Sequence, residues 1–445
     1  MWLFNLFQRV PYINEMTDQN LIQQHYKHWR IRIFYSMYFG YVCFYLTRKS
    51  FTFAMPYMMI ALGFTKADLG ILGSTLYITY GFSKFINGYI SDRSNPRYFM
   101  SIGLILTGIF NICFGFSSSM LFFVIFWGLN GWFQGCGWPP CARLLMHWYS
   151  QSERGRWWAM LNTSHNIGGG VIPVVVALVA QLYGWRISMF LPGFICIIVG
   201  LFLMNRLRDT PQSLGLPKIE KYRNDQKFFK DEEVRDGVLS QREIFIKYVV
   251  KNRCIWLLAI AYFFVYTIRT AICDWGQLYL YESKSLSLLI ASSCIFSFEL
   301  GGVVGNIFSG WCSDKVFGGK RGPVNCLWCL FVGCAILYLW AIPNGSFILA
   351  ATGMFMVGFF VFGPQMLIGL AAAELSHKEM GGSATGFVGW FAYLGAAFAG
   401  FPFGKITQDY GWWLFFTVLI MFSIIAAALL SPLWSVKERM ESAVI

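Results

Sequence analysis

The chain has 445 residues, of which 56% are hydrophobic and 13% are charged, and its apolar stretches are far longer than the core of a water-soluble domain needs. This composition excludes an ordinary soluble globular protein. The net charge of +13 would suit a nucleic-acid-binding protein, but the basic residues gather at the ends of apolar stretches, so we expect no nucleic-acid partner.

Charged residues and Gly/Pro positions divide the chain into about twelve apolar stretches, each near the roughly 20 residues that a bilayer-spanning helix needs. In chain order they are 33–54, 67–91, 98–116, 120–142, 157–180, 186–205, 254–280, 287–312, 323–342, 347–370, 383–404 and 412–434. Barrel strands are excluded, because the stretches are about twice a strand's length and lack strict alternation. The predicted fold class is an all-α membrane protein.

A polar stretch from Arg206 to Arg253 separates two sets of six spans. It predicts five segments: an N-terminal segment (1–32), a first six-helix half (33–205), an inter-half loop (206–253), a second half (254–434) and a tail (435–445). The twelve cysteines lie mostly within spans and form no disulfide framework, and the CxxC at Cys326–Cys329 indicates ordinary packing.

Positive charge predicts the orientation, because cytoplasmic loops hold more Lys and Arg than exported loops. The loops assigned to the inside hold Arg9, Lys27, Arg30, Arg32, Arg93, Arg97, Arg143, Arg154, Arg156, Lys315, Lys320, Arg321, Lys378, Lys437 and Arg439, and the loop 206–253 adds twelve more. The loops assigned to the outside hold only Lys66, Arg186, Lys284 and Lys405. We therefore expect both termini in the cytoplasm. The N-terminus lacks the length and cleavage pattern of a secretory signal.

Two arginines inside spans repeat one pattern. The matching residues are Tyr41, Tyr45 and Arg48 in the first span and Tyr262, Tyr266 and Arg269 in the seventh, each pair offset by about 221 positions. An arginine at bilayer depth costs about 2.5 to 3.5 kcal/mol even on the lenient insertion scale, so it usually faces a wet cavity or an anion. The pair predicts one anion site shared by two halves.

Other markers recur at a similar offset. The loop Gly88–Arg93 corresponds to Gly310–Lys315, and Tyr183–Trp185 corresponds to Tyr410–Trp412. Two parallel six-helix repeats around a central cavity are the plan of the major facilitator fold. The two loops resemble that superfamily's signature, with Asp92 and Arg93 in the first and Asp314 and Lys315 in the second.

Several strings resemble the organophosphate:phosphate antiporter family. They are Thr47–Ser50, Tyr80–Phe85, Ser91–Arg97, Gly137–Cys141, Ser164–Gly169 and Phe263–Tyr279. The run from Pro364 through His377–Glu379 to Gly395 looks most like the hexose-phosphate carrier and sensor branch, whereas Gly137–Pro140 looks more like the transporting members. This resemblance implies exchange of a sugar phosphate, preferably a hexose 6-phosphate such as glucose 6-phosphate, for inorganic phosphate. A glycerol 3-phosphate antiporter and a sugar-phosphate receptor with little transport remain open alternatives.

Helical spacing places basic and aromatic residues on shared faces, which suits phosphate, because guanidinium forks match phosphate oxygens and lysine adds a point charge. The predicted phosphate-binding residues are Arg48, Arg269, Lys84 and His165. The predicted cavity-lining residues are Tyr41, Tyr45, Tyr80, Trp138, Asn162, Tyr266 and Tyr393. Packing is the alternative for the tyrosines and for a neutral His165. Trp138, beside Pro139 and Pro140, indicates either a break or a kink in span four.

Charge counting supports an anion in the cavity. Arg48, Lys49, Lys84 and Arg269, set against Asp274 and Glu299, leave about +2, which a phosphate monoester of between one and two negative charges would balance. We expect Lys49 to pair across the halves with Asp274 or Glu299. Closing an unneutralised cavity is disfavoured at low dielectric, so the empty carrier should reorient poorly and exchange anions.

Scattered histidines without an accompanying carboxylate or nucleophile cluster argue against a membrane enzyme such as a phosphatase. We expect no cofactor and no metal. The expected partners are an organic phosphate, inorganic phosphate and the bilayer, with a signalling partner in the receptor case. We expect a monomer in the inner membrane of a bacterium.

Overall fold

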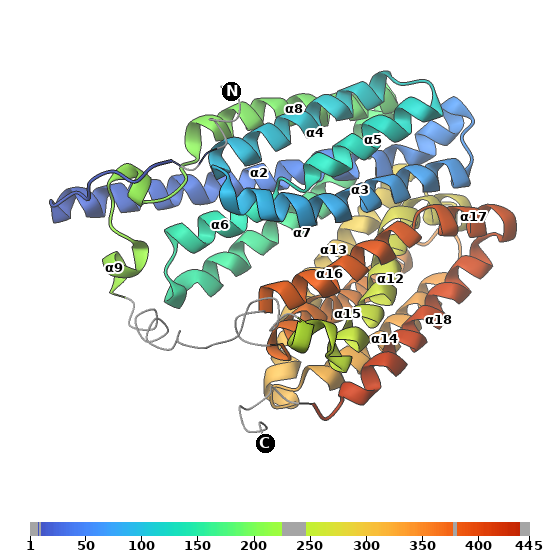
Figure 1. The fold of residues 1–445 in the computed structure, drawn as a ribbon. Coiled ribbons are helices and arrows are strands. Elements are labelled where there is room, and N and C mark those ends of the chain that lie inside the picture. Colours follow the sequence, from blue (N-terminus) through green and yellow to red (C-terminus); the bar gives the residue numbers. More distant parts are fainter. Residues whose placement is uncertain (1–7, 9, 225–245, 377–380, 437–445) are drawn as a thin grey trace. The chain divides into compact units, whose positions relative to one another are not determined.

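The computed structural model describes residue 8 and residues 10–224, 246–376 and 381–436, and within these ranges the chain is helical with no β-strand. The predictions for Arg9, residues 225–245, His377–Glu379 and the tail from residue 437 concern parts of the chain outside the described residues. Helices run along the whole described chain (Figure 1), which confirms the all-α fold class.

Nine helical segments of the described chain are long and apolar enough to cross a membrane. They are formed by α4 (Pro96–Phe116), α7 (Gln151–Tyr183), α8 (Trp185–Arg206), α12 (Arg253–Lys284), α13 (Leu288–Trp311), α14 (Arg321–Ala341), α15 (Phe347–Glu374), α16 with α17 (Gly381–Phe398 and Phe401–Tyr410) and α18 (Trp412–Leu430). The other predicted spans correspond to α2 (Gln19–Leu62), α3 (Lys66–Arg93) and α5 with α6 (Met120–Gln134 and Trp138–Trp148), which contain more polar residues or are shorter. Short turns complete the described chain: η1 (Gln212–Leu214), α9 (Ile219–Arg223), η2 (Ile246–Val250), η3 (Cys312–Val316) and η5 (Ser431–Leu433).

Three predicted spans differ from the observed helices. The first helix begins at Gln19 rather than 33, because its charged first turns stay helical outside the apolar stretch. The predicted span 120–142 is two helices interrupted at 135–137, and α6 starts with prolines in its first turn, where a missing N–H costs nothing. Span four is therefore broken rather than merely kinked. The predicted span 383–404 continues to Tyr410 and is interrupted at 399–400.

Internal contacts group the chain into two compact units. Unit 1 is Met1–Ser50, Thr79–Gly168 and Arg186–Val238, and unit 2 is Phe51–Ile78, Gly169–Trp185 and Leu239–Ile445. Each of the helices α2, α3 and α7 thus contributes residues to both units. The sequence halves 33–205 and 254–434 stay a prediction.

In unit 1, α4 packs closely against α8 and α5, as Figure 1 shows. A side chain at Gly108 of α4 would place its Cβ atom 2.6 Å from the carbonyl oxygen of Gly193 in α8. Phe114 of α4 packs on Phe123 and Trp127 of α5, with ring centroids 4.8 and 5.0 Å apart. Small residues at the α4–α8 contact let the two backbones approach, as expected for membrane helices.

In unit 2, α13 and α15 are in backbone contact. Cβ atoms added at Gly301 and Gly305 would lie 2.1 Å from the carbonyl oxygens of Phe355 and Phe359. A Cβ atom at Gly358 would in turn lie 2.0 Å from the Phe298 carbonyl oxygen. The four-residue spacing of Gly301 and Gly305 matches the small-residue pattern of membrane helix pairs.

Residues 51–78, the end of α2 and the start of α3, join unit 2 through polar contacts. The Ser74 hydroxyl donates to the Ala397 carbonyl oxygen at 2.6 Å. Lys66 pairs with Glu282 at 2.6 Å and lies 5.1 Å from the Trp412 ring, whose N–H also donates to Glu282 at 3.0 Å. These contacts fix residues 51–78 to α12, α16 and α18.

Candidate functional site

Arg48 of α2 is buried in unit 1, with 6% of its surface exposed. Its guanidinium carbon lies 4.4 Å from the centre of the Tyr45 ring and 4.6 Å from that of Tyr80. Its Nε–H donates to the side-chain oxygen of Gln134 at 3.1 Å. Stacked rings and a neutral amide orient the guanidinium without cancelling its charge.

A chain of buried amides holds Gln134 in place. The Gln134 amide donates to the Thr47 hydroxyl at 3.1 Å and to Asn130 at 3.0 Å. Asn130 donates to Asn111 of α4 at 3.3 Å, and Asn111 donates to the Met189 carbonyl oxygen of α8 at 2.6 Å. Because each member is hydrogen-bonded and buried, the network links α2, α5, α4 and α8 and fixes the position of Arg48.

The predicted aromatic residues of the first half gather beside Arg48. The Tyr41 ring lies 5.7 Å from that of Tyr45 and 5.1 Å from that of Trp138 at the start of α6. The His165 ring of α7 lies 6.3 Å from that of Tyr45. Gly168 makes room for this contact, because a Cβ atom there would lie 2.7 Å from the Tyr45 Cβ atom.

The remaining predicted residues of the first half are half-buried on the same helices. Lys84 follows Tyr80 by one turn of α3, and Asn162 precedes His165 by about one turn of α7. The roles of Lys84 and Asn162 in binding stay predictions.

Arg269 of α12 lies in unit 2 beside two rings of its own. Its guanidinium carbon is 4.7 Å from the centre of the Phe362 ring and 5.3 Å from that of Tyr266. It also donates to the Tyr266 hydroxyl at 3.2 Å. The Tyr266 ring is 5.7 Å from that of the predicted Tyr393. Arg269, Tyr266 and Tyr393 therefore lie together in unit 2, and their roles in binding stay predictions.

Asp274 and Glu299 are buried in unit 2, with 7% and 4% of their surfaces exposed. Asp274 accepts a hydrogen bond from the Tyr77 hydroxyl at 2.7 Å and one from Thr52 at 3.5 Å. A Cβ atom at Gly169 would lie 2.7 Å from a Glu299 carboxylate oxygen, so the glycine makes room for this side chain. The pairing of Lys49 with either carboxylate stays a prediction.

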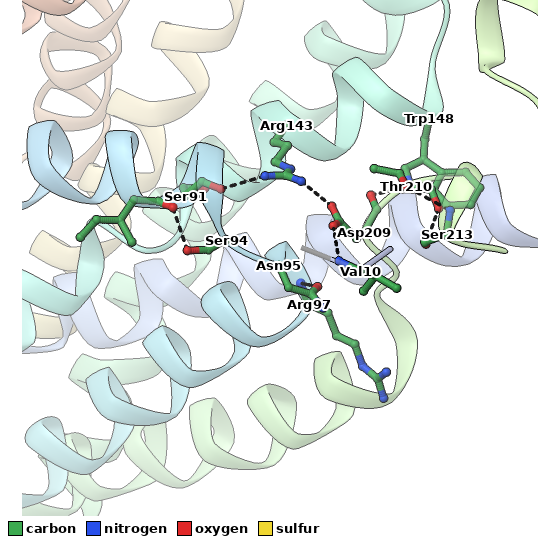
Figure 2. Close-up of polar contacts among 11 residues, drawn as sticks. Val10, Ser91, Ser94, Asn95, Arg97, Arg143, Trp148, Asp209, Thr210 and Ser213 are labelled. Atoms are coloured by element: carbon green, nitrogen blue, oxygen red, sulfur yellow. Dashed lines mark hydrogen bonds and ion pairs between the residues drawn. The ribbon is translucent and has the colours of Figure 1, made fainter. Parts of the chain in front are cut away.

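The two signature loops are bordered by ion pairs. In unit 1, buried Arg143 pairs with Asp209 at 2.7 Å and donates to the Ser91 carbonyl oxygen at 3.2 Å, as Figure 2 shows. The Trp148 indole N–H donates to the Asp209 carbonyl oxygen at 3.3 Å. The side chain of the predicted Asp92 lies outside the described part of the chain, and the predicted Arg93 is exposed, with its guanidinium carbon 3.7 Å from the Tyr89 ring centre.

In unit 2, Arg321 has the corresponding role. It pairs with the predicted Asp314 at 2.5 Å and with Glu374 at 3.0 Å. The predicted Lys315 is exposed to solvent. Both loops are thus anchored by an arginine from a neighbouring helix, at the ends of the spans and away from Arg48 and Arg269 in the sequence.

Sequence reasoning missed Gln134, Phe362 and the pair formed by Arg143 and Asp209. Gln134 and Asn130 are uncharged polar residues one turn apart in an otherwise apolar helix, which was a usable signal for a buried polar network. Tyr77, one turn before Tyr80 on α3, was also missed, and its hydroxyl donates to Asp274. The contact of Phe362 with Arg269 could not be recognised in the sequence, because Phe362 is one of many apolar residues in α15.

Comparison with known proteins assigns the chain to a family. Residues 37–400 match the model of the Major Facilitator Superfamily. A protein named "Probable hexose phosphate transport protein" from Chlamydia trachomatis serovar D is 55% identical over 444 residues, covering 98% of this chain and 97% of that protein. The "Membrane sensor protein UhpC" of Escherichia coli K12 is 49% identical over 427 residues, covering 96% and 97%.

The fold is also that of a solved transporter. The structure of a bacterial homologue of the human lysosomal transporter Spinster has a TM-score of 0.75 at 13% identity, covering 91% of this chain and 97% of that chain. The resemblance to the hexose-phosphate carrier and sensor branch agrees with the relatives found, and the chain belongs to the Major Facilitator Superfamily as a multi-pass integral membrane protein.

Proposed function

We propose that the chain exchanges a sugar phosphate, preferably a hexose 6-phosphate such as glucose 6-phosphate, for inorganic phosphate across a bacterial inner membrane by alternating access. The observation that carries the proposal is Arg48, a buried guanidinium stacked on two tyrosine rings and fixed through a neutral amide. A cation oriented in this way is suited to bidentate binding of phosphate oxygens. The relative named a hexose phosphate transport protein is similar over nearly the whole chain, which supports a hexose as the organic group of the substrate.

The role of Arg269 rests on the repeat in the sequence. It ends the same Tyr-Tyr-Arg pattern as Arg48, and it too lies over aromatic rings. We assign both arginines to the substrate phosphate, with Lys84 and His165 as further contacts. Each half of the repeat would then contribute one guanidinium to the anion.

Exchange follows from electrostatics. A cavity with an uncompensated positive charge is costly to close at low dielectric, and a bound anion removes that cost. The loaded carrier would change conformation readily and the empty one poorly, so one phosphate leaves only when another binds. The charge bias of the loops places both termini in the cytoplasm in this proposal.

A receptor that binds sugar phosphate but transports little is the second candidate, because the sensor relative is 49% identical over nearly the whole chain. Such a receptor would pass the signal to a membrane or cytoplasmic partner. Binding without exchange would distinguish it from an antiporter.

Reconstituted vesicles loaded with phosphate test the proposal. We expect uptake of labelled phosphate to be inhibited by hexose phosphates, glycerol 3-phosphate and inorganic phosphate, with hexose 6-phosphates strongest and free glucose without effect. Empty vesicles should show little uptake. Strong uptake into empty vesicles would contradict obligatory exchange, and inhibition by free glucose equal to that by its phosphate would contradict a phosphate site.

A further inference from the structure

A cavity of about 670 Å³ lies in unit 1, between the first turns of α2, the start of α7 and the short helix α9. It is far from Arg48. Both Arg30, which lines the cavity, and Arg48 lie on α2, and eighteen residues of helix at about 1.5 Å each separate them by roughly 27 Å. The cavity is therefore a separate place from the proposed exchange site.

Four cations and one carboxylate line the cavity, which gives it a formal charge of +3. The lining cations are Lys27, Arg30, Arg156 and Arg223, and the carboxylate is Glu153. Glu153 bridges two of them, with oxygens 2.6 Å from an Arg30 nitrogen and 3.1 Å from an Arg223 nitrogen. Among the described residues, no ion pair involves Lys27 or Arg156. The positive charge of the lining thus exceeds what its own carboxylate can balance.

Aromatic contacts make one wall of the cavity rigid. The guanidinium carbon of Arg30 lies 4.7 Å from the Tyr149 ring centre and 5.9 Å from that of Trp157. On the α9 side, the Tyr26 ring stacks on Tyr222 at 4.2 Å. The Tyr26 hydroxyl donates to the Pro217 carbonyl oxygen. Arg30 and Tyr26 are therefore pre-oriented, while exposed Lys27 and Arg156 can adjust to a ligand.

From this geometry we infer that the cavity is a second anion site, which binds an organic phosphate through Lys27, Arg156 and the Arg30–Glu153–Arg223 bridge. Its volume is in the range of small-molecule sites and exceeds what a bare phosphate ion would fill. The half-buried rings of Tyr222 and Trp157 line the cavity and offer apolar surface to the organic part. The proposal does not depend on the exchange function of Arg48.

A free phosphate monoester and a phospholipid headgroup share this chemistry but differ in titration. Burial alone would raise the pKa of Glu153, but its hydrogen bond with Arg30 and the charges of Arg30 and Arg223 outweigh burial and lower it. The carboxylate therefore stays ionised well below neutral pH, and the charge of the lining holds. A monoester dianion takes up one proton near pH 6 and loses one negative charge, whereas a phosphodiester headgroup keeps its single charge.

Calorimetric binding of glucose 6-phosphate to the full chain in phosphatidylcholine nanodiscs tests the inference. We expect two binding events, one at the cavity and one at the proposed exchange site. The double variant Lys27→Gln, Arg156→Gln should weaken the cavity event by about tenfold or more and leave the other event unchanged. Arg48→Lys should affect only the other event. The charge-preserving pair Lys27→Arg with Arg156→Lys should retain both events, and Lys218→Gln, a basic residue of the same region outside the cavity lining, should change neither.

Two further measurements distinguish a free phosphate monoester from a phospholipid headgroup as the ligand of the cavity. For a free monoester, the cavity event should weaken between pH 7.5 and 5.5 and persist in nanodiscs that contain phosphatidylglycerol. For a lipid headgroup, phosphatidylglycerol should abolish the cavity event by competition. A single event in both lipids, lost in Arg48→Lys and unchanged by the Lys27 and Arg156 pair, would overturn the second site while leaving the exchange proposal intact.

Discussion

Arg48 and Arg269 end the same sequence pattern, yet their surroundings differ. Arg48 is tied through Gln134 to a chain of buried amides that crosses four helices. Arg269 lies on Phe362 and Tyr266 and donates to the hydroxyl of a tyrosine one turn away on its own helix. The hydrogen bond of Arg48 leads into a network that joins four helices, whereas the hydrogen bond of Arg269 joins two residues of α12 and its Phe362 contact reaches α15. We therefore expect Arg48 to set where phosphate binds and Arg269 to adapt to it.

The largest effect should come from replacing the arginines themselves. Arg48→Lys should lower phosphate exchange by about 100-fold, because a hydrogen bond to a charged group contributes about 1.5 to 3 kcal/mol and lysine cannot bind bidentately. Arg269→Lys should lower it less, because an adaptable cation tolerates a change of shape better. Initial rates in phosphate-loaded vesicles measure both. Arg206→Lys, at the end of α8 beside Phe202, is the matched control. Equal exchange in all three variants would contradict the assignment.

Gln134→Glu should have the next largest effect. A carboxylate 3.1 Å from the Arg48 Nε atom would compensate the guanidinium and compete with substrate. We expect phosphate binding to weaken by about tenfold to fiftyfold while the protein stays folded, because the new ion pair with Arg48 offsets the loss of the two hydrogen bonds that the Gln134 amide donates to Thr47 and Asn130. Binding isotherms and thermal unfolding together check this. Unchanged binding in a folded Gln134→Glu variant would show that Arg48 does not contact phosphate.

Tyr266→Phe tests how Arg269 is oriented. It removes the hydroxyl that accepts the 3.2 Å hydrogen bond but keeps the ring. The loss of one such hydrogen bond should weaken binding by about tenfold or less. In the exchange assay, we expect Tyr266→Phe to raise KM at constant kcat, because Arg269 is then less well oriented for substrate binding. A loss of phosphate affinity in Tyr266→Phe as large as that in Gln134→Glu would contradict the difference between the surroundings of Arg48 and Arg269.

Phe362→Leu should give the smallest effect. It replaces the ring 4.7 Å from Arg269 by an aliphatic side chain. Because the guanidinium is only half-buried, the lost cation–π contact should cost about 0.5 to 1 kcal/mol. We expect a loss of about twofold to fivefold in affinity. Phe360→Leu, on the same helix and in contact with Trp328 rather than Arg269, serves as a control for packing. A larger loss in the control would assign the effect to packing.

The sequence predicted the helices well and the contacts only in part. Long apolar stretches give the spans, and Pro139 with Pro140 gives the break before α6, because both signals are local. The shared face of Tyr41, Tyr45 and Arg48 on α2 follows from helical spacing.

Contacts between helices could not be predicted in the same way. Gln134 reaches Arg48 because α5 packs on α2 in one particular register, which no local pattern specifies. Asp274 accepts hydrogen bonds from Tyr77 and Thr52, two donors on α3 and α2 that no local pattern in the sequence indicates.

The amide chain behind Arg48 also bears on how the protein is made. Asn111, Asn130 and Gln134 emerge from the ribosome on α4 and α5, after Thr47 and Arg48, but the carbonyl group that completes the chain is Met189 on α8. Until α8 has been inserted, the Asn111 amide lacks this acceptor in an apolar environment. Arg48 can therefore meet Gln134 as soon as α5 is in place, whereas the hydrogen bond that ties the amide chain to α8 forms last and completes the network.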